Sequence, residues 1–181
     1  MLTALGSLAT QQANPTKNTL ARINQFLDYA LSHPDAGITY RASDIVLAAH
    51  SDASYLSEMN AISRAGGHFF LSENDHYPNN NGSVLTIAQI IKAVMSSAAE
   101  AELGALYINA LELIPLHHLL IKMDHSQPPM PIQTNNSTAL ALSTIPSNPN
   151  EPRPWTCISI GSVAVQTNSI FAHIDVPRLP I

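Results

Sequence analysis

The sequence predicts a single α/β domain whose mixed sheet has three antiparallel strands plus one parallel strand, with a long helix on one face. Three features predict it: three strand-like runs with short connections between residues 45 and 91, a periodic helical stretch after Ser97, and a short strand-like segment at residues 132–136. The chain has 181 residues, 45% of them hydrophobic. That length suits one domain with a real core but is too short for two comfortable ones.

The first element is an amphipathic helix over residues 18–32. Its apolar residues recur at helical spacing, and Asn18 is a plausible N-cap. The helix should end at His33, because Pro34 follows. The apolar positions are Leu20, Ile23, Leu27, Ala30 and Leu31.

The next three elements are strands. The run IVLAAHSDASY, residues 45–55, is apolar and then abruptly polar, which predicts a buried strand that presents Asp52 at its end. GGHFFLSE, from Gly66, is the second strand, and VLTIAQII, residues 84–91, is the third, after the polar turn DHYPNNNGS. Short connections between the three runs favour an antiparallel meander.

A long helix follows the meander. Ser96 and Ser97 precede AAEAELGALYINALELI, in which leucines and alanines form a helical stripe. Pro115 is expected to kink or end this helix, with LHHLLIKM as a second piece. The segment IQTNN, residues 132–136, then predicts a short strand, and STALAL is a possible helix start.

The C-terminal stretch changes character. IPSNPNEPRP, residues 145–154, carries four prolines and excludes regular structure there. The following WTCISIGSVAVQTNSIFAHI alternates apolar and polar residues in runs able to pair as strands, although nothing upstream obviously needs them. We therefore predict a linker and N-terminal helix at 1–40, a compact domain at 41–142 and an irregular segment at 143–181.

Composition narrows the class of protein. A formal charge of −5 and a charged fraction of 12% disfavour tight nucleic-acid binding by electrostatics alone. Cys157 is the only cysteine, so an internal disulfide and a multi-cysteine zinc site are excluded. The N-terminus MLTALGSLAT does not resemble a signal peptide, and no apolar run approaches the length of a membrane span. We expect an intracellular monomer, cytoplasmic or nuclear, without a membrane partner.

Four sequence blocks carry a family resemblance. HSDASY, RAGGHFFLS, MSSAAEAELGAL and PIQTNNSTA follow one another in that order. The chain resembles the ribonuclease H region of copia-type LTR-retrotransposon polyproteins, where the corresponding blocks are SDA, SGY or AGG, SSxEAE and TDNxSA. The likeness covers roughly residues 1–140, and the LTALGSLA opening and the helix around Asp28 resemble the linker after a reverse transcriptase. It implies a ribonuclease H-like fold, an RNA/DNA hybrid as substrate, and a reverse transcriptase domain in the parent polyprotein.

The resemblance also implies a metal site. Asp52 matches the family's central acid and Glu102 its second, so both would bind Mg²⁺ or Mn²⁺ for two-metal hydrolysis of the RNA strand. No other cofactor is expected. Taken singly, an Asp after a strand is usually a turn residue and a Glu at a helix start a dipole partner, so only their order carries the inference.

Two departures from the family pattern predict lost activity. The third acid falls on Asn135, and an amide leaves the cations less neutralised, so we expect a large loss of rate. The family then continues into a basic segment similar to IQPKRTKAMDM and a fourth acid. Suitable codons for Pro146 to Cys157, read two bases later, yield that segment, so we infer a frameshift near residues 141–146. The C-terminal part of the fold should be incomplete, and Asp175 is not expected to replace the fourth acid.

The remaining polar candidates have milder interpretations. Glu100 cannot share a helical face with Glu102 and is assigned to the solvated helix end. The adjacent His117 and His118 are expected on a polar or amphipathic face. His50 shares a strand face with Asp52 and either influences the metal site or is a core or edge histidine. Arg64 is either a phosphate contact or, more simply, an exposed loop residue.

Two hypotheses stay open. The first is a metal-dependent endonuclease of ribonuclease H type that uses Asp52 and Glu102. The second is a non-catalytic remnant that acts, if at all, as a weak nucleic-acid or protein-binding module. The second predicts no metal-dependent cleavage.

Overall fold

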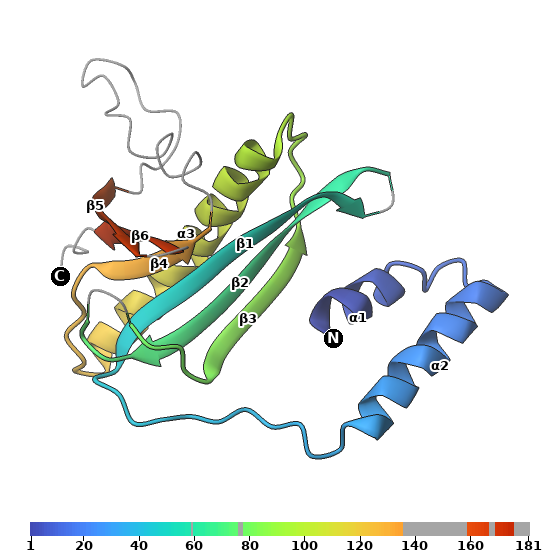
Figure 1. The fold of residues 1–181 in the computed structure, drawn as a ribbon, viewed down its shortest axis with the longest axis horizontal. Helices are drawn as coiled ribbons and strands as arrows, with labels where there is room; N and C mark the ends of the chain where they lie inside the picture. Colours follow the sequence, from blue (N-terminus) through green and yellow to red (C-terminus); the bar gives the residue numbers. More distant parts are fainter. Residues whose placement is uncertain (59, 76–77, 136–158, 167–168, 176–181) are drawn as a thin grey trace.

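The computed structural model describes residues 1–58, 60–75, 78–135, 159–166 and 169–175, and side-chain environments up to residue 135. A mixed sheet carries one long helix, α3, on one face (Figure 1). The strand order is β3-β2-β1-β4-β6-β5. The elements are α1 Leu2–Ala9, α2 Lys17–Ser32, β1 Val46–Glu58, β2 Ile62–Ser72, β3 Ser83–Ile90, α3 Ala98–Lys122, β4 Met130–Thr134, β5 Ser159–Gln166 and β6 Ser169–Asp175.

The predicted fold class is confirmed. Strands β1, β2 and β3 form an antiparallel meander, and β4 pairs with β1 in parallel. The chain runs from β3 through α3 to β4, so the long helix makes the crossover that a parallel strand requires. The layout of three antiparallel strands, one parallel strand and one long helix is the one that the sequence predicted.

The core lies between α3 and the face of the sheet made by alternate strand residues. On β1 these are Leu47 and Ala49, which pack with Leu113 of the helix and Ile132 of β4. Leu113 and Ile132 are fully buried. Because side chains alternate along a strand, His50 and Asp52 belong to the opposite face. The complete buried cluster is Leu47, Ala49, Phe69, Leu106, Ala110, Leu113, Met130 and Ile132.

A buried amide ties α3 to the centre of the sheet. Asn109 is fully buried, and its Nδ2 donates to Ser51 Oγ at 2.8 Å and to the Gly66 carbonyl at 2.9 Å. Gly67 permits this approach, because a Cβ there would collide with Asn109 Oδ1 and lie 2.8 Å from Phe69 Cε2. The helix therefore has one fixed position relative to β1 and β2.

Helix α3 begins as predicted but does not break at Pro115. Ser97 is the N-cap, and its side chain accepts from the Glu100 amide. The expected end at Pro115 is wrong, since the helix continues to Lys122. Pro115 has no N–H, so the Leu111 carbonyl loses its helical hydrogen bond, but both residues are exposed. On either side of the proline, Leu113 and His117 are buried. Packing on both sides of the proline outweighs one missing hydrogen bond.

The same helix is long and apolar enough to cross a membrane, by length and composition only. In the structure, α3 instead covers the sheet, with Ala105, Leu106, Ala110 and Leu113 buried against it. That packing is typical of the core helix of a folded domain.

Several predicted boundaries shift. Strand β1 was expected to present Asp52 at its end, but it continues to Glu58, so Asp52 lies within the strand. The N-cap of α2 is Thr16, in a reciprocal capping box with Thr19, in place of the expected Asn18. The helix ends at His33, as predicted.

The segment at 143–181, expected to be irregular, contains two strands. Strand β6 pairs antiparallel with β4, with Ile132 opposite Ala172, and β5 pairs with β6. The alternation of apolar and polar residues in this segment suits strand pairing. Strand β6 pairs with the edge of β4 that faces away from β1. STALAL, the possible helix start, and the proline-rich stretch lie outside the described residues.

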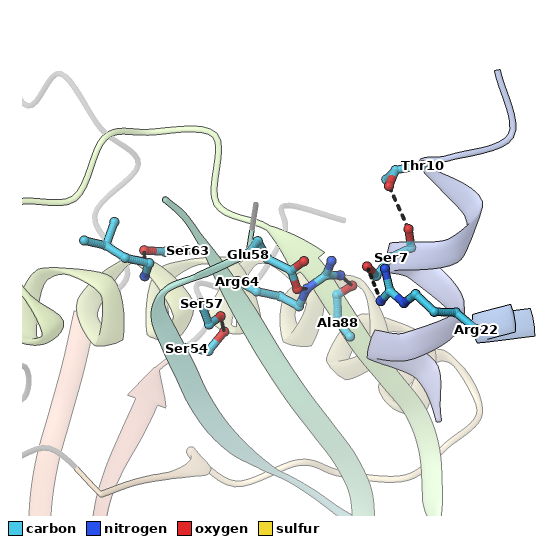
Figure 2. A network of polar contacts seen from close by, with 10 residues as sticks. Ser7, Thr10, Arg22, Ser54, Ser57, Glu58, Ser63, Arg64 and Ala88 are labelled. Atoms are coloured by element: carbon cyan, nitrogen blue, oxygen red, sulfur yellow. Dashed lines mark hydrogen bonds and ion pairs between the residues drawn. The ribbon is translucent and has the colours of Figure 1, made fainter. Parts of the chain in front are cut away.

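Arg64 is neither an exposed loop residue nor a free phosphate contact. It is 6% exposed, its Nε donates to Glu58 Oε1 at 2.7 Å, and its Nη1 donates to the Ala88 carbonyl at 2.8 Å. Figure 2 shows this network beside α1, where a Cβ on Gly6 would lie 3.3 Å from Nη1. The arginine therefore connects the far ends of β1, β2 and β3 next to the N-terminal helix.

Candidate functional site

The three residues that the family resemblance singled out come from three neighbouring elements. Asp52 lies in β1, the strand between β2 and β4. Glu102 lies in the first turns of α3, and Asn135 follows the last residue of β4. Helix α3 packs on β1, and β4 pairs with β1, so both elements approach the strand that carries Asp52.

Asp52 and Glu102 interact through their charges. Burial, and to a smaller extent the negative charge of Asp52, raise the pKa of the Glu102 carboxyl to about 7. A hydrogen bond from the Ala53 amide partly opposes both effects. Glu102 is 8% exposed, whereas Asp52 faces solvent. The site thus joins one accessible and one buried carboxylate of like charge.

The buried carboxylate is incompletely satisfied. Glu102 Oε2 has no hydrogen-bond partner among the described residues. A buried carboxylate oxygen without a partner is costly unless a cation or another donor reaches it. This oxygen is therefore the atom of the site that can still accept a hydrogen bond or coordinate a cation.

Asn135 lies at the level of Asp52. In the parallel pairing of β1 with β4, Ala49 is opposite Ile132 and His50 is opposite Gln133. Two more residues along both strands lead to Asp52 and Asn135. Asn135 is exposed, so its amide can reach a ligand at the same end of the sheet.

Glu100 lies at the helix end, as predicted, and its side chain caps the start of α3. Its Oε2 accepts from the Ser96 amide at 2.6 Å and from the Ser96 hydroxyl at 2.5 Å. These hydrogen bonds lower the pKa of the Glu100 carboxyl, in the opposite direction to the shift at Glu102. Two glutamates separated by one residue therefore have different roles, one at the helix end and one at the site.

The donor set at this site suits a hard divalent cation, although it is small. Two carboxylates and one amide supply the oxygen ligands that Mg²⁺ and Mn²⁺ prefer. Within the described residues, no group of three or more histidine, cysteine or acidic side chains is arranged to hold a metal ion. The amide at position 135 supplies no charge.

Sequence reasoning noted His50 but missed its partner. His50 and His68 lie opposite each other on β1 and β2, with ring centroids 5.8 Å apart. Burial lowers the pKa of His50 to about 4, and the positive charge of His68 contributes in the same direction. The cross-strand register of the β1–β2 hairpin, if it had been worked out from the sequence, would have placed His50 opposite His68.

The histidine pair in α3 behaves differently from the prediction. His117 is buried, with no hydrogen-bond partner for Nδ1 among the described residues, so its expected place on a polar or amphipathic face is wrong. Burial and the neighbouring His118 lower its pKa. The two rings make an edge contact with centroids 5.6 Å apart. Their site is separate from the carboxylates, fifteen residues along the helix from Glu102.

A pocket of about 320 Å³ lies elsewhere, between α1 and α2, where Leu8, Phe26 and Tyr29 contribute to a mostly apolar lining. None of the three site residues lines it. At the carboxylate site, Asp52 is exposed on the sheet and Glu102 is buried in α3. Comparisons with protein-family models, curated proteins and solved structures found no match to this chain, so the site is interpreted from its own residues.

Proposed function

We propose that this chain is a ribonuclease H-type domain of a retrotransposon polyprotein whose Asp52 and Glu102 bind a divalent cation, and that Asn135 has cost it cleavage of RNA/DNA hybrids. The observation that carries the proposal is the charge interaction of Asp52 in β1 with Glu102 in α3, with Asn135 at the end of the neighbouring strand β4. In the parent polyprotein the domain would follow a reverse transcriptase.

The electrostatics of the carboxylate pair support cation binding. Two like charges, one of them buried, repel each other, and the raised pKa of Glu102 reports that cost. A divalent cation close to both carboxylates would offset this repulsion. The unpartnered Glu102 Oε2 supplies a ligand atom that no other described group uses.

Each residue has a distinct task in this proposal. Exposed Asp52 is accessible to both an ion and a phosphate of the substrate, and buried Glu102 is held by the Ala53 amide. A Mg²⁺ or Mn²⁺ ion, when bound, supplies charge stabilisation and an activated water for phosphodiester hydrolysis. Asn135 contributes an oxygen without a charge, so the positive charge of the bound cations is neutralised less completely than it would be by an aspartate.

The decisive experiment combines cation binding with cleavage. We expect wild-type protein to bind Mn²⁺, measured by calorimetry, and to leave an end-labelled RNA/DNA hybrid intact. Asp52→Asn should abolish Mn²⁺ binding, and Asn135→Asp should strengthen it by about ten-fold, comparable to other changes around metal sites. Asn60→Asp, in the exposed β1–β2 turn, is the charge-matched control and should leave binding unchanged.

Two results would contradict the proposal. Absence of Mn²⁺ binding in folded wild-type protein would favour the alternative of a non-catalytic remnant without a metal site. Metal-dependent cleavage by the wild type that Asp52→Asn abolishes would show a working nuclease despite Asn135. If Asn135→Asp binds Mn²⁺ but does not cleave the hybrid, the inactivity is due to the inferred loss of the C-terminal segment and the fourth acid.

A further inference from the structure

Two histidines face each other on the side of the sheet opposite α3. His50 of β1 is the direct cross-strand partner of His68 of β2, and both are half-buried. Their ring centroids are 5.8 Å apart. Directly opposite residues of an antiparallel pair share a face of the sheet, so both rings are available on the same surface.

His68 is oriented by hydrogen bonds that fix its tautomer. Its Nε2 lies 3.2 Å from the Asn81 carbonyl oxygen and 3.0 Å from Asn80 Oδ1. A main-chain carbonyl can only accept, so Nε2 carries the hydrogen and Nδ1 keeps its lone pair. Metal-binding histidines are typically held in this way, with the second ring nitrogen donating to a carbonyl or carboxylate.

His50 is positioned by packing. Its ring makes an edge contact with Phe70, with centroids 4.9 Å apart and planes at 78°. Phe70 is fully buried, so it provides a rigid support for the imidazole.

The spacing of the two rings suits one shared ion. An ion about 2.0–2.1 Å from one nitrogen of each imidazole places the ring centroids roughly 5–6 Å apart. The same row across the sheet continues to Thr86 of β3 and to Gln133 of β4, so polar side chains flank the pair on both sides.

We propose that His50 and His68 form a binding site for a borderline transition-metal ion of the Zn²⁺ or Ni²⁺ class, with water completing the coordination. Imidazole nitrogens favour such ions, whereas the carboxylates at Asp52 and Glu102 favour Mg²⁺ or Mn²⁺. The described residues place no third imidazole or carboxylate with the pair, so the bound ion keeps exchangeable positions. The proposal does not depend on nuclease ancestry.

The first test uses unmodified, tag-free protein and ZnCl₂ as the probe. In NMR spectra, Zn²⁺ should shift the ring resonances of His50 and His68 and leave those of exposed His33 in place. His50→Asn and His68→Asn should each weaken Zn²⁺ binding at least about ten-fold in calorimetry. His33→Asn is the matched control and should bind as the wild type does.

The outcomes separate the two metal sites. Asp52→Asn should retain Zn²⁺ binding while losing Mn²⁺ binding, which shows that the histidine site is independent of the carboxylates. The proposal is overturned if Zn²⁺ leaves both ring signals unchanged in the wild type, or if folded His50→Asn binds Zn²⁺ normally. Loss of Zn²⁺ binding in Asp52→Asn would also overturn it, because the ion would then belong to the carboxylate site.

Discussion

The two faces of β1 serve different purposes, although their residues alternate along one strand. Ser51 points toward α3, is buried, and accepts a hydrogen bond from Asn109. Its neighbours His50 and Asp52 lie on the opposite face, one half-buried and one exposed. The helix-covered face of β1 holds the fold together, and its other face carries His50 and Asp52, one in each of the two proposed metal sites. Substitutions on the first face should change stability, and those on the second should change binding.

The largest effect is expected in the core. Leu113→Ala should lower the free energy of unfolding by about 2–5 kcal/mol, because Leu113 is fully buried between α3 and the sheet. Leu119→Ala is the matched control, since Leu119 is 53% exposed on the same helix and should cost less than about 0.5 kcal/mol. Urea denaturation measures both. Equal losses would refute the assigned faces of α3.

A smaller loss is expected where the helix approaches the sheet most closely. Gly67→Ala should cost about 1–3 kcal/mol, since the added methyl meets Asn109, Ile87 and Phe69. Gly66→Ala is a matched control, because its Cβ would meet only the Asp52 carbonyl oxygen at an ordinary 3.7 Å. Thermal unfolding of the two variants compares them. A Gly67→Ala protein as stable as Gly66→Ala would mean that Asn109 is not held at this position.

Glu102 should make stability depend on pH in a particular direction. Its folded pKa of about 7 lies above the ordinary 4.5, so the folded state holds the proton more tightly and stability falls as pH rises from about 4.5 through 7. Glu102→Gln should therefore be more stable than the wild type at pH 8, on the order of 1 kcal/mol, and equal to it at pH 4.

The control for this pH effect is Glu100→Gln. The pKa of Glu100 is lowered, so its contribution is present above its unfolded pKa and lost as pH falls. Glu100→Gln should thus reduce stability at pH 8, the opposite sign to Glu102→Gln. Urea titrations at pH 4 and pH 8 measure both variants. The same sign for the two glutamates would contradict their assigned environments.

The smallest change in stability is expected at Asp52 itself. Asp52→Asn removes an exposed charge and should alter the free energy of unfolding by less than about 0.5 kcal/mol. It should also lower the pKa of Glu102 toward its ordinary value, because one of the two causes that raise it disappears. Carboxyl ¹³C NMR of Glu102 reads this shift directly. An unchanged pKa would show that the two carboxylates do not interact.

Elements with strong local signals were predictable. The three strands of the meander, the serine cap of α3 and the short strand after it follow from apolar patterning and capping chemistry, which act over a few residues. Asp52 and Glu102 were identified from sequence blocks, and their electrostatic interaction in the structure agrees with a shared site. Glu100 was assigned to the helix end because residues two apart cannot share a helical face.

Elements that depend on distant partners were not predictable. Strand β6 follows a proline-rich stretch and gains its place only by pairing with β4, about forty residues earlier in the chain. Arg64 resembles a loop residue in the sequence, yet the longer β1–β2 hairpin buries it against Glu58. His117 is polar but lies on the buried side of a helix that an internal proline was expected to end.

The sequence by itself determined which residues are candidates for the site and in what order they occur: Asp52, then Glu102, then Asn135, on strand, helix and strand end. Only the tertiary structure decided their environments. Burial raises the pKa of Glu102, cross-strand register pairs His50 with His68, and the close packing at Gly67 fixes α3 against β1. Local propensities depend on neighbours in the chain, whereas desolvation and charge interactions depend on groups that only folding brings together.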